Sequence, residues 1–197
     1  MTAPILTRLT TPTIDPVSLA EMKTHLRVDG DDEDAAITDA MADAAAFIET
    51  HCNIALAPAS WEILFDTPAS LPLTLPIWPV TSVDSVTYSN GDSPDPEVEA
   101  SIYRLVKGQP ATMHLAYDAT WPSMRTEAAA LRVLVTAGWP GDGASPEVWT
   151  GPLQARRAIK LVVGHWYANR ETVNIGSSVS ELPFAAGALL AQLRLFL

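Results

Sequence analysis

The chain has 197 residues, 48% of them hydrophobic and 18% charged, which is long enough for a buried core and too apolar for a disordered protein. Its 12 Lys and Arg residues against 23 Asp and Glu residues give a net charge of -11, which disfavours sequence-independent binding to the phosphates of nucleic acids. The single cysteine, Cys52, excludes an internal disulfide framework and suits a reducing compartment. The N-terminus lacks a signal peptide's basic start, and no stretch has the roughly eighteen apolar residues of a membrane helix. We therefore expect a soluble protein made in the cytoplasm, with no membrane partner.

Two helices are predicted within residues 16–56. Ser18 and Glu21 have the spacing of a capping box, which marks the start of the first helix. Its short apolar stripe ends where Asp29 and Gly30 interrupt the pattern. In the second helix, apolar residues recur at helical spacing on one face: Ile37, Met41, Ala44, Ile48 and Cys52.

An acidic run separates these two helices, with five acids in the six positions from Asp29 to Asp34. A calcium loop of the EF-hand kind needs a glycine at its sixth position and a bidentate Glu at its twelfth. Counted from Asp29, these positions hold Asp34 and Ala40, so the calcium pattern fails. Acids at a helix start are favoured by the helix dipole, by about 0.3–1 kcal/mol each. We interpret the run as the entry to the second helix and predict no metal site.

The hydrophobic period changes from helical to alternating over residues 59–138. The prolines of residues 71–80 fit an edge or an extended strap and exclude a central strand. Strands are predicted at five segments: 60–66, 82–88, 101–108, 111–118 and 131–138. This pattern indicates a mainly antiparallel sheet or small barrel between helical parts.

Helical spacing returns after residue 139, where Ala155, Ile159, Val162 and Trp166 share one face. A Gly- and Ser-rich break at 174–183 precedes the C-terminal "FAAGALLAQLRLFL", which we interpret as a short helix or strap. The predicted fold class is α+β, a helical bundle with an inserted antiparallel β-rich region. Its bundle has two N-terminal helices and a long C-terminal helix. The predicted parts are 1–58, 59–138, 139–182 and a partner-binding strap at 183–197.

Signatures of common catalytic and cofactor sites are missing, including the P-loop, HExxH, GxSxG and GxGxxG patterns. The four histidines lie on separate predicted elements: His25, His51, His114 and His165. His51 is adjacent to Cys52, but neighbouring residues on a helix point in different directions. We predict no catalytic residue, cofactor or metal. A small enzyme with a site of scattered side chains stays an alternative.

Two stretches suggest interfaces instead of chemistry. In "GHWYANRE", Trp166, Tyr167 and Arg170 are residue types that often anchor interfaces. The alternative is that Trp166 is core and the other two ring the helix end. The last nine residues hold six large apolar side chains, which must pack on this domain or on a partner because exposing them is costly.

Five stretches in this order resemble a known family: "SLAEMKTHLRVDGDDEDAAI", "LPIWPVTSVDSVTY", "TAGWP", "PLQARRAIKLVVGHWYANRETV" and "LPFAAGALLAQLR". They are similar to the head–tail connector, or adaptor, family of long-tailed phages and gene transfer agents, from about Ser18 to Arg194. The resemblance implies a structural virion protein without enzymatic activity, located in the neck and assembled in the host cytoplasm. It also implies a ring, usually of twelve copies, that lies under the portal, prolongs the DNA channel and docks the next connector, stopper or tail protein.

The resemblance also implies that the C-terminal segment binds the portal protein. The residues expected in this contact are Phe184, Leu189, Leu190, Leu193, Arg194, Leu195, Phe196 and Leu197. The alternative is that the strap packs back onto the helix of Ala155, Ile159 and Val162 as ordinary core. DNA would pass through the acidic ring without specific binding, because like charges repel. A stopper or tail-terminator ring is the other virion module that fits.

Overall fold

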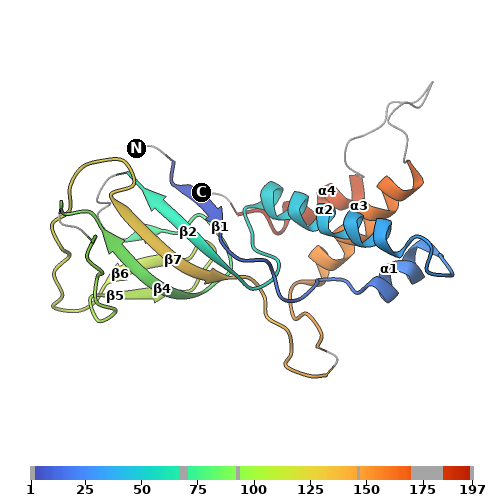
Figure 1. The fold of residues 1–197 in the computed structure, drawn as a ribbon, viewed down its shortest axis with the longest axis horizontal. Helices are drawn as coiled ribbons and strands as arrows, with labels where there is room; N and C mark the ends of the chain where they lie inside the picture. Colours follow the sequence, from blue (N-terminus) through green and yellow to red (C-terminus); the bar gives the residue numbers. More distant parts are fainter. Residues whose placement is uncertain (1–2, 67–70, 92–93, 146, 170–183, 196–197) are drawn as a thin grey trace. The chain divides into compact units, whose positions relative to one another are not determined.

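Figure 1 shows the computed structural model, which describes residues 3–66, 71–91, 94–145, 147–169 and 184–195. The fold is mixed α+β. In chain order its elements are β1 (Ile5–Arg8), α1 (Leu19–Leu26), α2 (Asp34–Cys52), β2 (Ala59–Phe65), β3 (Leu73–Thr74), β4 (Val80–Tyr88), β5 (Tyr103–Val106), β6 (Thr112–Leu115), β7 (Leu131–Ala137), α3 (Leu153–Ala168) and α4 (Phe184–Ala191). The strands predicted at 60–66, 82–88, 101–108, 111–118 and 131–138 are found as β2, β4, β5, β6 and β7.

The chain divides into two compact units. The β-unit comprises Met1–Thr13, Ala57–Trp139 and Leu195–Leu197, and the helical unit comprises Ile14–Leu56 and Pro140–Arg194. The N-terminal strand β1, which sequence analysis did not predict, belongs to the β-unit.

Two antiparallel sheets build the β-unit. One has the strand order β1-β2-β7-β4 and the other β3-β6-β5. Along β2 every second residue is buried, from Ala59 to Phe65, and β7 has the same alternation. This alternation arises because successive side chains of a strand point to opposite faces, so Trp61, Ile63 and Val133 face the core. β4 pairs with β7 through two register shifts.

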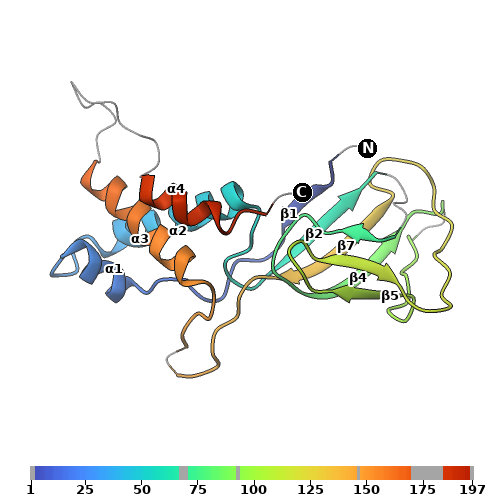
Figure 2. The same ribbon diagram turned by 180° about the vertical axis from the view of Figure 1, so that it is seen from behind.

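The helical unit begins with the capping box that the sequence predicts. The Ser18 side chain accepts a hydrogen bond from the Glu21 backbone, and the Glu21 side chain accepts one from the Ser18 backbone. α1 ends at Arg27, whose left-handed φ of 58° turns the chain toward α2. Helix α3 contacts α1, α2 and α4, and both ribbon views place α4 beside α3 (Figures 1 and 2).

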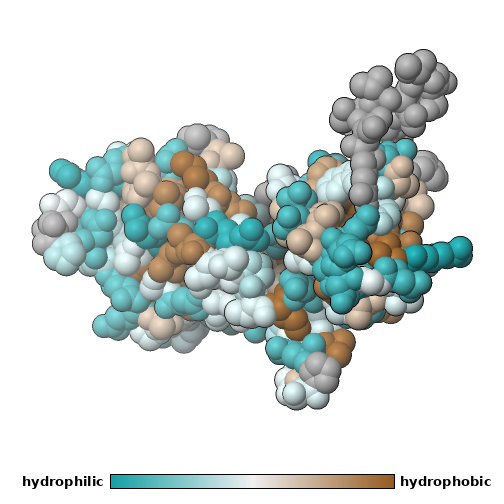
Figure 3. Space-filling model, turned by 45° about the vertical axis from the view of Figure 1, so that its right-hand side comes forward, coloured by the Kyte–Doolittle hydropathy of each residue, from teal (hydrophilic) through white to brown (hydrophobic). Residues whose placement is uncertain are grey.

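The core of the helical unit is formed by the apolar stripes of these helices. Completely or almost completely buried side chains include Met22, Ile37, Ile48, Ile159 and Leu190. On the surface, hydrophobic and hydrophilic residues are mixed over the face that Figure 3 shows. Among the helices that the structure describes, none combines the length and apolar character that a bilayer crossing requires.

Candidate interaction site

The acidic run between α1 and α2 is held by a lysine. Lys23 on α1 forms ion pairs with Asp31 at 2.8 Å and with Asp34 at 2.7 Å. The hydrogen bonds with Asp31 and Asp34 raise the pKa of Lys23, and Lys23 in turn lowers the pKa of Asp31. Asp34 is the first residue of α2, which agrees with the interpretation of the run as a helix entry. Within the described part of the chain, no three His, Cys, Asp or Glu residues are grouped as a metal site would require.

We predict that the purified protein carries no stoichiometric calcium or zinc. Lys23 supplies positive charge where a cation would otherwise compensate Asp31 and Asp34. Elemental analysis after dialysis, together with calcium titration followed by calorimetry, checks this expectation. One bound calcium per chain, lost when Asp31 is replaced by Asn, would show that the acidic run is a cation site.

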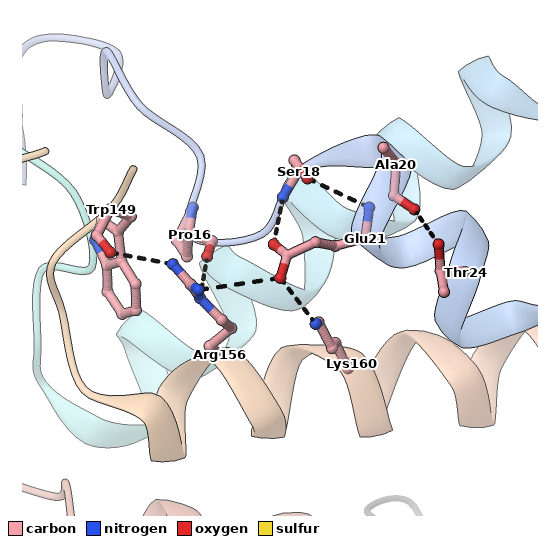
Figure 4. Close-up of polar contacts among 8 residues, drawn as sticks. All are labelled: Pro16, Ser18, Ala20, Glu21, Thr24, Trp149, Arg156 and Lys160. Carbon is pink, nitrogen blue, oxygen red and sulfur yellow. Dashed lines mark hydrogen bonds and ion pairs between the residues drawn. The ribbon is translucent and has the colours of Figure 1, made fainter. Parts of the chain in front are cut away.

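Glu21 joins α1 to α3 (Figure 4). Its Oε1 lies 3.3 Å from Nζ of Lys160 and 4.0 Å from Nη1 of Arg156. Arg156 also donates hydrogen bonds to the carbonyl oxygens of Pro16, at 3.1 Å, and Trp149, at 3.0 Å. Trp149 in turn donates its indole N–H to the Leu56 carbonyl at 2.6 Å. These contacts bind the chain that enters α1, the chain that leaves α2 and the start of α3 into one cluster.

Partial burial acts to raise the pKa of Glu21, but the hydrogen bond with Ser18 and the cations Lys160 and Arg156 outweigh it. The pKa of Glu21 therefore lies below its ordinary value of 4.5. Because the folded-state pKa is the lower one, the contribution of Glu21 to stability is present above pH 4.5 and is lost as the pH falls through the folded-state pKa.

Replacing Glu21 with Gln is expected to lower the free energy of unfolding at pH 7 by up to about 1 kcal/mol, because partly exposed ion pairs contribute little. The Glu21 side chain is 41% exposed. At pH 3 the difference between the variant and the original protein is expected to shrink. Urea denaturation at both pH values measures it, and a difference that grows on acidification would contradict the assignment.

The thiol of Cys52 and the rings of two histidines contact neighbouring groups. The Cys52 side chain is fully buried, and its Sγ lies 3.7 Å from the carbonyl oxygen of Leu190, to which it donates. Burial raises the pKa of Cys52 to about 11, so the thiol is protonated at neutral pH and is a poor nucleophile. His51 is stacked on the ring of Phe47, and His114 shares a hydrogen bond with the Thr112 hydroxyl.

Trp166 and Tyr167, two of the predicted interface residues at the end of α3, contact α2 and its N-cap residue. The ring of Trp166 meets Phe47 edge-on with centroids 6.3 Å apart, and the hydroxyl of Tyr167 is hydrogen-bonded to Glu33. Both side chains are half-buried, while Arg170 lies outside the described residues. Their role in an interface with another protein stays a prediction.

The described part of the C-terminal segment is helix α4, followed by a turn at Gln192 and Leu193. Ala186 and Leu190 are completely buried, and Leu193 is 6% exposed. Leu195, which belongs to the β-unit, is 2% exposed, whereas Leu189 is half-buried and Arg194 is exposed. Helix α4 contacts α3 and α2, so the segment packs within its own subunit, as the core alternative expects. The side chain of Phe184 and residues 196 and 197 lie outside the described part, and portal binding by this segment stays a prediction.

Two surface features of the helical unit were not predicted from the sequence. A groove lies between the segment before α1 and helix α2, with Asp15 and Val17 on one side and Ala42 and Ala45 on the other. Leu153, the first residue of α3, is 74% exposed. The exposure of Leu153 could have been predicted from the sequence, because this residue lies outside the apolar stripe that begins at Ala155.

The comparisons with known proteins agree with the family resemblance. Residues 16–103 match the sequence profile described as "Phage gp6-like head-tail connector protein". No curated protein matches the chain. The resemblance predicted from the sequence motifs is thereby confirmed.

Three solved structures share the fold. A chain in "Virion of native gene transfer agent (GTA) particle" is 24% identical with a TM-score of 0.75, and one in "Neck of empty GTA particle computed with C6 symmetry" is 24% identical with a TM-score of 0.74. A chain in "Neck of native GTA particle computed with C12 symmetry" is 22% identical with a TM-score of 0.72. Each comparison covers 98% of this chain and 96% of the other.

Proposed function

We propose that this chain is a head–tail connector, a structural virion protein that lies in the neck between head and tail. The observation that carries the proposal is the connector profile over residues 16–103, together with a fold shared along 98% of the chain with chains of gene transfer agent particles. In this role the protein has no catalytic activity. Copies of the chain form a ring under the portal, prolong the DNA channel and dock the next connector, stopper or tail protein.

The charge of the chain fits a DNA channel. A ring of twelve copies at -11 each would carry a total charge of roughly -130, which opposes adsorption of DNA within the Debye length of about 10 Å. Helix α2 contributes to this charge with the exposed side chains of Asp39 and Asp43. DNA would therefore pass without specific contacts.

The two units suggest different roles in the ring. We propose that the helices act as a bundle that carries the ring, and that the β-rich region 59–138 contacts neighbouring copies. Beyond the ring, the proposed partners of this chain are the portal protein on one side and the tail-side protein on the other. For the portal contact we propose the C-terminal residues 184–197, with Trp166, Tyr167 and Arg170 as a further interface.

Particles assembled without this chain test the proposed function. We expect DNA-filled heads that lack tails, and restored tail attachment when purified protein is added. A cryo-electron microscopy map of the neck should then contain a ring of this chain directly under the portal. A ring at the distal tail end would favour a tail terminator, and a ring separated from the portal by another protein would favour a stopper. Normal tailed particles without the chain would refute the connector function.

A further inference from the structure

The groove beside α2 has an apolar floor. Val17 and Ile159 are 1% exposed and Met41 is 8% exposed, and all three line it. Ala42 and Ala45 line it on α2 with short side chains. The floor therefore offers an apolar surface to an inserted aliphatic group.

The rim of this groove carries one carboxylate, and no residue that lines the groove is a cation. Asp15 lines the groove and is exposed. It has no ion pair or side-chain hydrogen bond within the described residues. An aliphatic side chain accompanied by a cation would complement both the floor and the rim.

The start of α3 presents such a pair. Leu153 is 74% exposed, and Arg157 lies one helical turn later on the same face. The neighbouring cations Arg156 and Lys160 are paired with Glu21 inside the subunit. Arg157 is exposed and has no ion pair in the part of the chain that the structure describes.

We infer that Leu153 and Arg157 of one copy occupy the groove of a second copy, with Leu153 on the apolar floor and Arg157 facing Asp15. This inference rests on the proposed ring and names one contact within it, in addition to the contacts proposed for the β-rich region. Leu153 and the groove residue Ile159 are six positions apart on α3, so they point about 120° apart around the helix axis. In the proposed contact the two surfaces of one copy would face different neighbours. Such a head-to-tail contact is heterologous and generates a closed ring when its rotation closes.

Disulfide trapping between two variants tests the contact. One protein carries Leu153→Cys and the other carries Ala42→Cys, and the native Cys52 is fully buried and does not compete. Thr50→Cys is the matched control, because it is exposed on the same helix two turns farther along. Under mild oxidation we expect the Leu153→Cys and Ala42→Cys mixture to give at least about tenfold more cross-linked dimer than the mixture with Thr50→Cys. Equal yields, or a dominant dimer of Leu153→Cys with itself, would overturn the inference.

Charge reversal provides an independent measurement. Arg157→Glu and Asp15→Arg are each expected to weaken self-association about tenfold or more, because each places like charges together. The double variant is expected to recover most of the loss. Light scattering over a range of concentrations measures assembly, and circular dichroism checks that each variant is folded.

The outcomes separate this inference from the proposed function. Rings that form with unchanged affinity in both single variants would overturn the Leu153–Arg157 contact and leave the connector function intact. Unmodified protein that neither self-associates nor joins tailless heads would instead contradict the connector function.

Discussion

Replacing Gly138 with Ala is expected to lower the free energy of unfolding by about 3 kcal/mol or more, because it combines a steric clash with backbone strain. Gly138 has a φ of +122°, which side chains of L-residues rarely adopt. A Cβ at this position would lie 2.2 Å from the carbonyl carbon and oxygen of Ala57 and 2.7 Å from the nitrogen of Pro58. These are backbone atoms just before β2, so they cannot yield as a flexible side chain can. Urea denaturation of the variant measures the loss.

Gly143 supplies the matched control for this substitution. Its φ is +74°, so Ala is also strained there, but a Cβ would meet nothing within 4 Å. Gly143→Ala is therefore expected to cost only about 1 kcal/mol. If the two variants lose the same stability, the close approach of Ala57 is not what requires glycine at position 138.

Local patterns in the sequence predict most of the regular structure. Helix α2 and strand β7 are long enough for their periods of 3.6 and 2 to be distinguished, because each buries one face. Strand β1 was missed because it has four residues and only partial burial, so its alternation carries almost no signal. Its place is decided by pairing with β2, whose residues lie more than fifty positions later in the chain.

The interaction surfaces were harder to predict, because their residues come together only when the chain folds. Lys23 was not assigned a partner from sequence, because only the turn between α1 and α2 brings Asp31 and Asp34 to it. The groove joins Val17, Met41 and Ile159 from three separate parts of the chain. The packing of α1 on α3 likewise pairs Arg156 and Lys160 with Glu21. Arg157 is left exposed.

The C-terminal segment shows what composition can and cannot decide. Six large apolar residues among the last nine required burial, and the sequence left the subunit's own helices and the portal as alternative partners. In the structure Leu190 and Leu193 are buried within the subunit, where α4 packs on α3 and α2. Composition therefore indicated the need for burial, while the partner depended on tertiary packing.

Replacing Leu190 with Ala is expected to lower the free energy of unfolding by about 2–5 kcal/mol, the usual range for a buried leucine. Leu190 is completely buried, and its backbone carbonyl accepts a hydrogen bond from the Cys52 thiol. Gln192→Ala, an exposed change one residue beyond α4, is the control and should leave stability unchanged. Denaturant unfolding of both variants measures the difference. A loss for Leu190→Ala as small as that of the control would contradict the packing of α4.

Removal of residues 184–197 then relates this packing to the proposed portal contact. Because α4 covers α2 and α3, the truncated chain is expected to be less stable than the Leu190→Ala variant, which keeps the rest of the helix.

If the segment also binds the portal, a part of it must leave this site or dock through the side chains that remain accessible, Leu189 and Arg194. Ordering on a partner would cost contact energy. In the proposed ring of twelve copies this cost would be offset, because each engagement raises the effective concentration for the next. Replacing Arg194 with Glu is therefore expected to weaken attachment to portal-bearing heads, with a smaller loss of stability than Leu190→Ala. Attachment that persists in this variant and in every truncated chain that still folds would leave α4 as core alone.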